Sequence, residues 1–181
     1  MNIPNLISLC RLLVVPLVVW LILSGQMAEA FWLFVVAGAS DAVDGFIAKR
    51  FNAATVFGGY LDPIADKVLL VSVYVTLGVT GHVADWLVIM IVFRDVLILG
   101  GAILYYMVTQ SLAMQPVFIS KVNTAAQIAL ATVILASTGL KLDLGWLSQA
   151  LVFLTAATTL ISGGIYVVTW SRRAFALEDR R

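Results

Sequence analysis

The sequence predicts an all-α integral membrane protein, built as a bundle of six transmembrane helices. Of its 181 residues, 62% are hydrophobic and 12% are charged, whereas soluble domains are about 45–50% apolar and about 25% charged. A helix needs about 20 mostly apolar residues to cross a bilayer, and six stretches of the chain meet this condition. A globule of this size could not hide so much apolar surface from water, so lipid is the expected solvent.

The expected helices are separated by short breaks that contain turn-forming or polar residues. The helices cover residues 6–24, 29–50, 56–80, 84–107, 119–140 and 147–170. Gly25 and Gly81 interrupt the apolar pattern after the first and third stretches, and Pro116 does so after the fourth. Because the breaks are short, neighbouring helices are expected to run antiparallel. We expect one membrane domain over residues 1–171 and a short charged tail over residues 172–181.

The distribution of Lys and Arg predicts the orientation of the bundle. Lys49 and Arg50 lie between the second and third stretches, and Lys121 follows the break after the fourth. Four arginines follow the last stretch, whereas the opposite side carries only Lys141. Because positively charged loops stay in the cytoplasm, both termini should face the cytoplasm. The net charge of +1 gives no reason to expect nucleic-acid binding.

Four aspartates lie within the expected spans, where ionisable residues are costly and therefore point to function. Asp41 and Asp44 are three residues apart in the second helix, and Asp62 and Asp66 are four apart in the third. Each pair shares one helix face, and a short turn joins the two helices, so the two faces can meet. Protonation, pairing with Lys or Arg, or binding of a divalent metal would relieve the repulsion between them.

The chemistry of these carboxylates indicates which metal they would hold. Carboxylate oxygens are hard ligands that favour Mg²⁺, Mn²⁺ or Ca²⁺ over zinc. Four carboxylates are enough for two ions about 3.5–4 Å apart, a spacing that holds a reacting phosphoryl group. The acidic faces continue with Gly45 and Ala48 on the second helix and Gly58 on the third. These residues leave room for a diphosphate or a nucleotide, although small residues also serve helix packing in membranes.

The other charged residues of the spans are each open to two interpretations. Arg94 and Asp95 are either an internal ion pair, or a site in which Arg94 holds an acceptor phosphate and Asp95 orients it. Arg11 presents the same choice. Lys67 follows the last aspartate and is either a counter-charge or a substrate ligand. Lys121 is either an anchor at the membrane interface or a substrate ligand.

One run of residues resembles the signature of the CDP-alcohol phosphatidyltransferase family. It reads Asp41-x2-Asp44-Gly45-x2-Ala48-Lys49-x8-Gly58-x3-Asp62-x3-Asp66. Every spacing matches, and the one difference is Lys49, where the family usually has arginine; Arg50 follows immediately. The six-helix layout, with this motif across the second and third helices, is also similar to the family. The resemblance therefore covers nearly the whole chain.

The resemblance implies transfer of a phosphatidyl group from CDP-diacylglycerol to an alcohol, with release of CMP. It implies that Asp41, Asp44 and Asp62 bind two Mg²⁺ or Mn²⁺ ions. Asp66 would be the general base that takes the proton from the acceptor hydroxyl, and a further metal ligand. Family members commonly form homodimers in a bacterial inner membrane or a mitochondrial inner membrane, with the termini on the cytoplasmic or matrix side.

The resemblance also implies that Gly45, Ala48 and Lys49 line the CDP site, and Arg50 is expected to share the role of Lys49. The other candidate substrate-binding residues, chosen from their position and charge, are Gly58, Lys67, Arg94 and Lys121. Within the family, residues 94–96 and 116–127 look like the corresponding segments of eukaryotic-type cardiolipin synthases. Phosphatidylglycerol is therefore the expected acceptor, and glycerol 3-phosphate, the acceptor of phosphatidylglycerophosphate synthases, is the alternative.

Two other classes of membrane protein use intramembrane aspartates. A metal or proton transporter would usually carry them near the midplane with access from both sides, whereas these acids lie toward one interface. A membrane prenyltransferase would carry its Asp-rich motifs in two widely separated blocks, whereas one run spans adjacent helices here. The pattern therefore favours the phosphatidyltransferase.

Overall fold

The computed structural model describes the backbone of residues 3–51, 56–109 and 118–178, and the side chains of residues 9–40, 64–101, 107 and 118–169. Apart from turns, these ranges are entirely helical, which confirms the all-α prediction. The helices are α1 (Ile3–Leu23), α2 (Met27–Phe51), α3 (Val56–Val79), α4 (Asp85–Thr109), α5 (Phe118–Gly139) and α6 (Gly145–Glu178).

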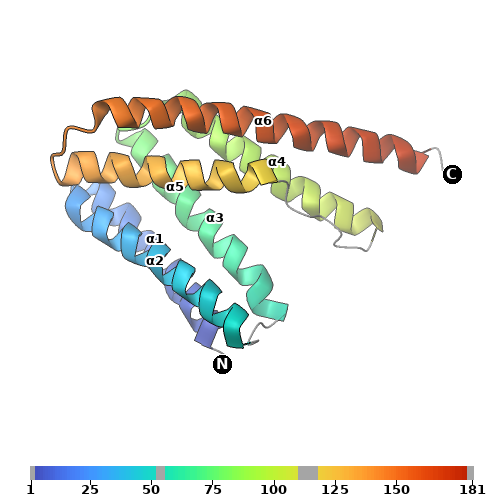
Figure 1. Cartoon of the computed structure of the whole chain (residues 1–181), viewed down its shortest axis with the longest axis horizontal. Coiled ribbons are helices and arrows are strands. Elements are labelled where there is room, and N and C mark those ends of the chain that lie inside the picture. Colours follow the sequence, from blue (N-terminus) through green and yellow to red (C-terminus); the bar gives the residue numbers. More distant parts are fainter. Residues whose placement is uncertain (1–2, 52–55, 110–117, 179–181) are drawn as a thin grey trace.

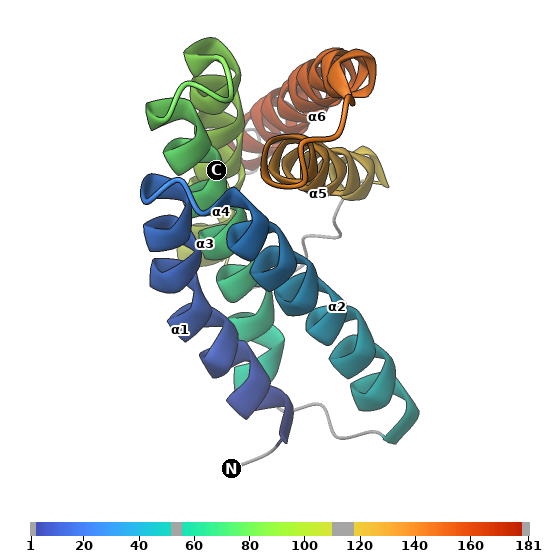
Figure 2. The ribbon, with the colours of Figure 1, turned by 90° about the vertical axis from the view of Figure 1, so that its left-hand side faces the viewer.

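Consecutive helices run antiparallel, as the short breaks predict (Figure 1). The turns between α1 and α2, α3 and α4, and α5 and α6 lie toward the same end of the molecule. Helix α1 packs against α2 and α3, whereas α4 and α5 both pack against α6. Helix α5 also packs against α2, so it joins the group formed by α1–α3 to the α5–α6 pair (Figures 1 and 2).

Glycine ends α1 and α3 in the same way. Gly25 and Gly81 have positive φ angles of 74° and 76°, which glycine adopts without steric cost. The amide of Gly25 donates to the carbonyl of Ile22, and the next amide, of Gln26, donates to the carbonyl of Leu21. The amides at positions 81 and 82 repeat this pattern. Both helices thus end in a Schellman motif, which satisfies their last carbonyls and reverses the chain.

The core lies toward the three turns, and its buried residues come mainly from α1 to α5. Among its fully buried side chains are Val18, Val73, Leu77, Leu87, Leu130 and Leu135. At this end Gly139 of α5 lies directly against the start of α2, because a Cβ at that position would stand 2.6 Å from the backbone of Met27 and Ala28. Only glycine permits this approach, which fixes the end of α5 on α2.

Helix α6 is longer than the sequence predicts. The apolar stretch predicts a helix over residues 147–170, but the helix runs without a break from Gly145 to Glu178. The charged segment that begins at Arg172 is therefore helical through Glu178, and its separation from the membrane domain stays a prediction.

Two of the described helical segments have the length and composition of a membrane span, Phe118–Gly139 and Gly145–Thr169. The apolar stretches Leu9–Leu23 and Met27–Ser40 are shorter. Large apolar side chains such as Trp20, Phe93 and Phe153 are exposed on the outside of the bundle. The presence of six helices is confirmed, and a membrane crossing by all six stays a prediction.

Candidate active site

A cavity of about 390 Å³ lies between α1, α2, α3 and α5. Three charged side chains, Arg11, Asp66 and Lys67, form part of its wall. The rest of the wall is mainly apolar or small, with Phe34, Val35, Gly38, Ala39, Leu69, Leu70 and Ile128, and it includes the hydroxyls of Thr124 and Thr132. A cavity with both charged and apolar walls suits an amphipathic molecule such as a phospholipid.

Asp66, the predicted general base, reaches this cavity from α3. Its side chain is 45% exposed, and one carboxylate oxygen accepts a hydrogen bond from Nη1 of Arg11 on α1. The Arg11 side chain is only 4% exposed, so the carboxylate provides a charged partner for a buried guanidinium. The pair connects α1 to α3, and it leaves part of the carboxylate accessible from the cavity.

Lys67 and Asp95 form a second ion pair beside the first. Nζ of Lys67 lies 2.8 Å from both carboxylate oxygens of Asp95 on α4. Nη1 of Arg94 donates to the same carboxylate at 2.7 Å. Asp95 is nearly buried, so it lies between two cations, one from its own helix and one from α3.

Arg94 is an anchor between helices in this structure. Its Nη2 atom donates to the hydroxyls of Ser120 on α5 and Ser162 on α6, at 2.5 and 2.6 Å. Its Cγ lies 3.7 Å from the position of a Cβ at Gly163. The residue is 3% exposed and does not line the cavity. This geometry matches the ion-pair interpretation of Arg94 and Asp95, because both terminal nitrogens are already engaged inside the protein.

The other predicted site residues fall into two groups. Lys121 is exposed near the start of α5, about one helical turn before Thr124 at the cavity wall. The remaining residues are located by their helices only, because their side chains lie outside the described ranges: Asp41, Asp44, Gly45, Ala48, Lys49 and Arg50 on α2, and Gly58 and Asp62 on α3. Asp41 follows Gly38 of the cavity wall by one turn, and Asp62 precedes Asp66 by one turn. The meeting of all four carboxylates therefore stays a prediction.

Sequence reasoning missed buried polar contacts that α5 makes with α6 and with α3. Asn123 is fully buried, and its Oδ1 accepts hydrogen bonds from the hydroxyls of Thr158 and Thr159 at 2.8 and 2.9 Å. One turn further along α5, Gln127 is also fully buried, and its backbone carbonyl accepts a hydrogen bond from the hydroxyl of Tyr74. Two amide side chains four residues apart in an apolar helix were the available signal, since such residues hydrogen-bond across membrane helices.

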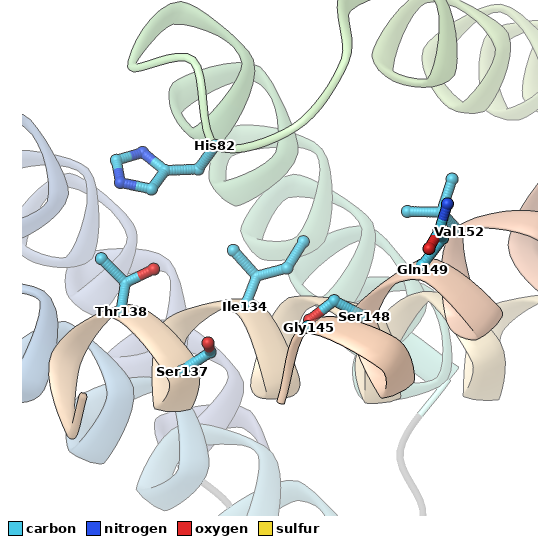
Figure 3. A pocket seen from close by; sticks show the side chains of 8 residues that line it. All are labelled: His82, Ile134, Ser137, Thr138, Gly145, Ser148, Gln149 and Val152. Atoms are coloured by element: carbon cyan, nitrogen blue, oxygen red, sulfur yellow. The ribbon is translucent and has the colours of Figure 1, made fainter. Parts of the chain in front are cut away.

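A second cavity, of about 410 Å³, lies beside the α5–α6 turn (Figure 3). Its polar wall includes His82, Thr138, Ser148 and Gln149. None of the described side chains that line it is acidic. His82 is a titratable group on this wall, but the described residues of the wall offer no carboxylate that could hold a divalent metal. The cavity beside Asp66 is therefore the candidate active site.

Comparison with known proteins identifies the family. The family model described as CDP-alcohol phosphatidyltransferase matches residues 1–161. The chain belongs to this family.

The chain is similar to relatives whose names give two different reactions. A chloroplastic CDP-diacylglycerol–glycerol-3-phosphate 3-phosphatidyltransferase of Oryza sativa is 36% identical over 72% of this chain and 45% of its own length. The cardiolipin synthase (CMP-forming) of Rattus norvegicus is 34% identical over 75% of this chain and 50% of its own. A cardiolipin synthase (CMP-forming) and mitochondrial hydrolase fusion protein of Schizosaccharomyces pombe is 31% identical over 96% and 31%. The chain thus spans half or less of the length of these relatives.

Proposed function

We propose that this protein transfers the phosphatidyl group of CDP-diacylglycerol to phosphatidylglycerol, giving cardiolipin and CMP. Membership of the family and the names of several relatives support the reaction class. The observation that carries the proposal is the position of Asp66, a half-exposed carboxylate on the wall of a cavity with charged and apolar surfaces. A reaction between two lipids needs such a cavity, because the reacting head groups and the acyl chains must be accommodated together.

Asp66 would act as the general base toward the acceptor hydroxyl. A base must come within hydrogen-bond distance of the proton that it removes, and the exposed part of this carboxylate can be reached from the cavity. Its contact with Arg11 holds the carboxylate in one orientation. The oxygen of the deprotonated hydroxyl then attacks the β-phosphorus of CDP-diacylglycerol, a new P–O bond forms, and the bond to CMP breaks.

The carboxylates of Asp41, Asp44, Asp62 and Asp66 would hold two Mg²⁺ or Mn²⁺ ions. Asp66 is the residue of this set whose side chain the structure describes. It fits the role of a metal ligand, because its carboxylate offers hard oxygen ligands at the cavity wall. Bound ions would stabilise the negative charge that develops on the diphosphate. Gly45, Ala48, Lys49, Arg50 and Gly58 would line the CDP site on α2 and α3.

We further propose that the bundle spans a bacterial-type or mitochondrial inner membrane, with both termini on the cytoplasmic or matrix side. The two span-length segments and the exposed apolar side chains support this placement. A homodimer is part of the same proposal, because members of the family commonly form one.

Glycerol 3-phosphate is the alternative acceptor, because one relative is named for that substrate. The test offers purified protein in micelles CDP-diacylglycerol with phosphatidylglycerol and glycerol 3-phosphate at equal concentrations. Mass spectrometry of the lipid product is expected to show cardiolipin. Phosphatidylglycerophosphate as the dominant product would contradict the proposed acceptor and leave the transfer reaction standing.

A further inference from the structure

The ammonium group of Lys67 lies at the cavity with at least one N–H donor that Asp95 does not use. It lines the cavity together with Asp66, and its side chain is 37% exposed, against 7% for Asp95. A lysine ammonium has three N–H donors. Asp95 accepts at most two of them through the two 2.8 Å contacts. At least one donor therefore remains for a ligand in the cavity.

Asp95 is itself held by a second cation besides Lys67. Arg94 donates to it, and the same guanidinium is bonded to Ser120 on α5 and Ser162 on α6. Asp95 cannot turn away from Lys67 without leaving the buried charge of Arg94 uncompensated, which is costly. The position of the ammonium is therefore determined by four helices, and the lysine side chain is ordered before any ligand arrives.

The other cations near the cavity have different tasks. Arg94 is buried and does not line the cavity. Arg11 does line it but is bonded to Asp66, the predicted base. The described cavity wall therefore has two cations: Arg11 is bonded to Asp66, the predicted base, and Lys67 is bonded to Asp95. Lys67 can meet a second anion without displacing a contact of Asp66.

We propose that Asp95 is a positioning residue that holds Lys67 against the phosphate of the acceptor, so that the acceptor is an alcohol carrying a phosphate ester. This inference rests on the proposed function, in which Asp66 contacts the acceptor hydroxyl. In a glycerol phosphate group, the free hydroxyl and the phosphate are separated only by the glycerol carbons. A cation next to the base in sequence and on the same cavity wall therefore suits the phosphate of the acceptor.

The test compares kinetic constants of Lys67→Gln, Asp95→Asn and the double variant, with Asp85→Asn as control. Asp85 is an exposed acid in the first turn of the same helix as Asp95. Loss of one charge-assisted hydrogen bond should raise KM for phosphatidylglycerol at least about tenfold, with a smaller change in kcat and none in KM for CDP-diacylglycerol. The double variant should be no worse than Lys67→Gln, and Lys67→Arg should restore part of the affinity.

Lys67→Gln leaves the Asp95–Arg94 pair in place, so this variant is expected to fold with an unchanged melting temperature. Glycerol, a neutral acceptor, should react equally slowly with the wild type and with Lys67→Gln.

An unchanged KM for phosphatidylglycerol in Lys67→Gln, or a rise in KM for CDP-diacylglycerol alone, would overturn the inference. So would an Asp95→Asn variant that loses stability and kcat but keeps its acceptor KM. A wild type that releases no CMP with any alcohol would contradict the proposed function itself.

Discussion

At the scale of residues, Asp66 contacts Arg11 in the structure and would contact the acceptor hydroxyl in the proposed reaction. Asp66→Asn keeps the size of the side chain and one oxygen but removes the basic group. Turnover is expected to fall by about 10²–10⁴, the usual contribution of a general base, while metal-dependent binding of CDP-diacylglycerol is retained. Steady-state kinetics and equilibrium binding measure the two effects separately. If nucleotide binding disappears as well, Asp66 is mainly a metal ligand.

The sequence identifies Asp66 and Lys67 as site candidates because charged residues are rare in apolar helices. It could not assign the partner of Lys67. Asp95 is 28 residues away, so their contact depends on how α3 packs against α4. The hydroxyls of Ser120 and Ser162 carried even less signal, since serine in a helix often bonds its own backbone.

At the scale of elements, Gly139 sets the distance between the end of α5 and the start of α2. Gly139→Ala would place a methyl group 2.6 Å from the backbone of Met27 and Ala28, and backbone atoms cannot move aside as a flexible side chain does. We expect a loss of about 1–3 kcal/mol of stability, as overpacking usually causes, seen as a lower melting temperature of the purified protein.

Gly164→Ala is the matched control for this change. Gly164 lies inside α6 with open space where its Cβ would be, and alanine favours helix more than glycine does. The control should melt at or above the temperature of the wild type. Equal melting temperatures for the Gly139 and Gly164 variants would show that α5 does not approach α2 as described.

The helix boundaries were predictable wherever the sequence contains a turn signal. Gly25 and Gly81 mark the ends of α1 and α3, and both adopt the left-handed conformation that glycine allows. The sequence predicts that the last helix ends at residue 170, whereas α6 runs to Glu178. Arg172 and Arg173 indicate a membrane interface, but they do not stop a helix. Neither glycine nor proline follows Gly164, so no residue breaks α6 where its apolar part ends.

At the scale of the whole molecule, the sequence predicts the number and order of the helices but not their packing. The candidate cavity depends on contributions from α1, α2, α3 and α5. The Arg11–Asp66 contact joins residues 55 positions apart, and the sequence left the role of Arg11 open. Spacing along one helix predicts which residues share a face, but it does not predict which helix that face meets.

The proposed orientation gives a test of the six-span arrangement. The α3–α4 turn and the end of α6 should lie on opposite sides of the membrane, because three helices, α4, α5 and α6, separate them. Reporter fusions at Gly81 and at the C-terminus are expected to show opposite locations. The same location for both reporters would exclude six membrane crossings.

The central claim is a metal-dependent transfer of a phosphatidyl group at the aspartate motif of α2 and α3. Its most direct test is CMP release from CDP-diacylglycerol and phosphatidylglycerol by the purified protein, with Asp44→Ala compared with Glu29→Ala. Glu29 is an exposed acid in the first turn of the same helix. CMP release should require Mg²⁺ or Mn²⁺ and the acceptor, fall by orders of magnitude in Asp44→Ala, and persist in Glu29→Ala. Near-normal turnover in Asp44→Ala, or CMP release that survives a chelator, would contradict the account.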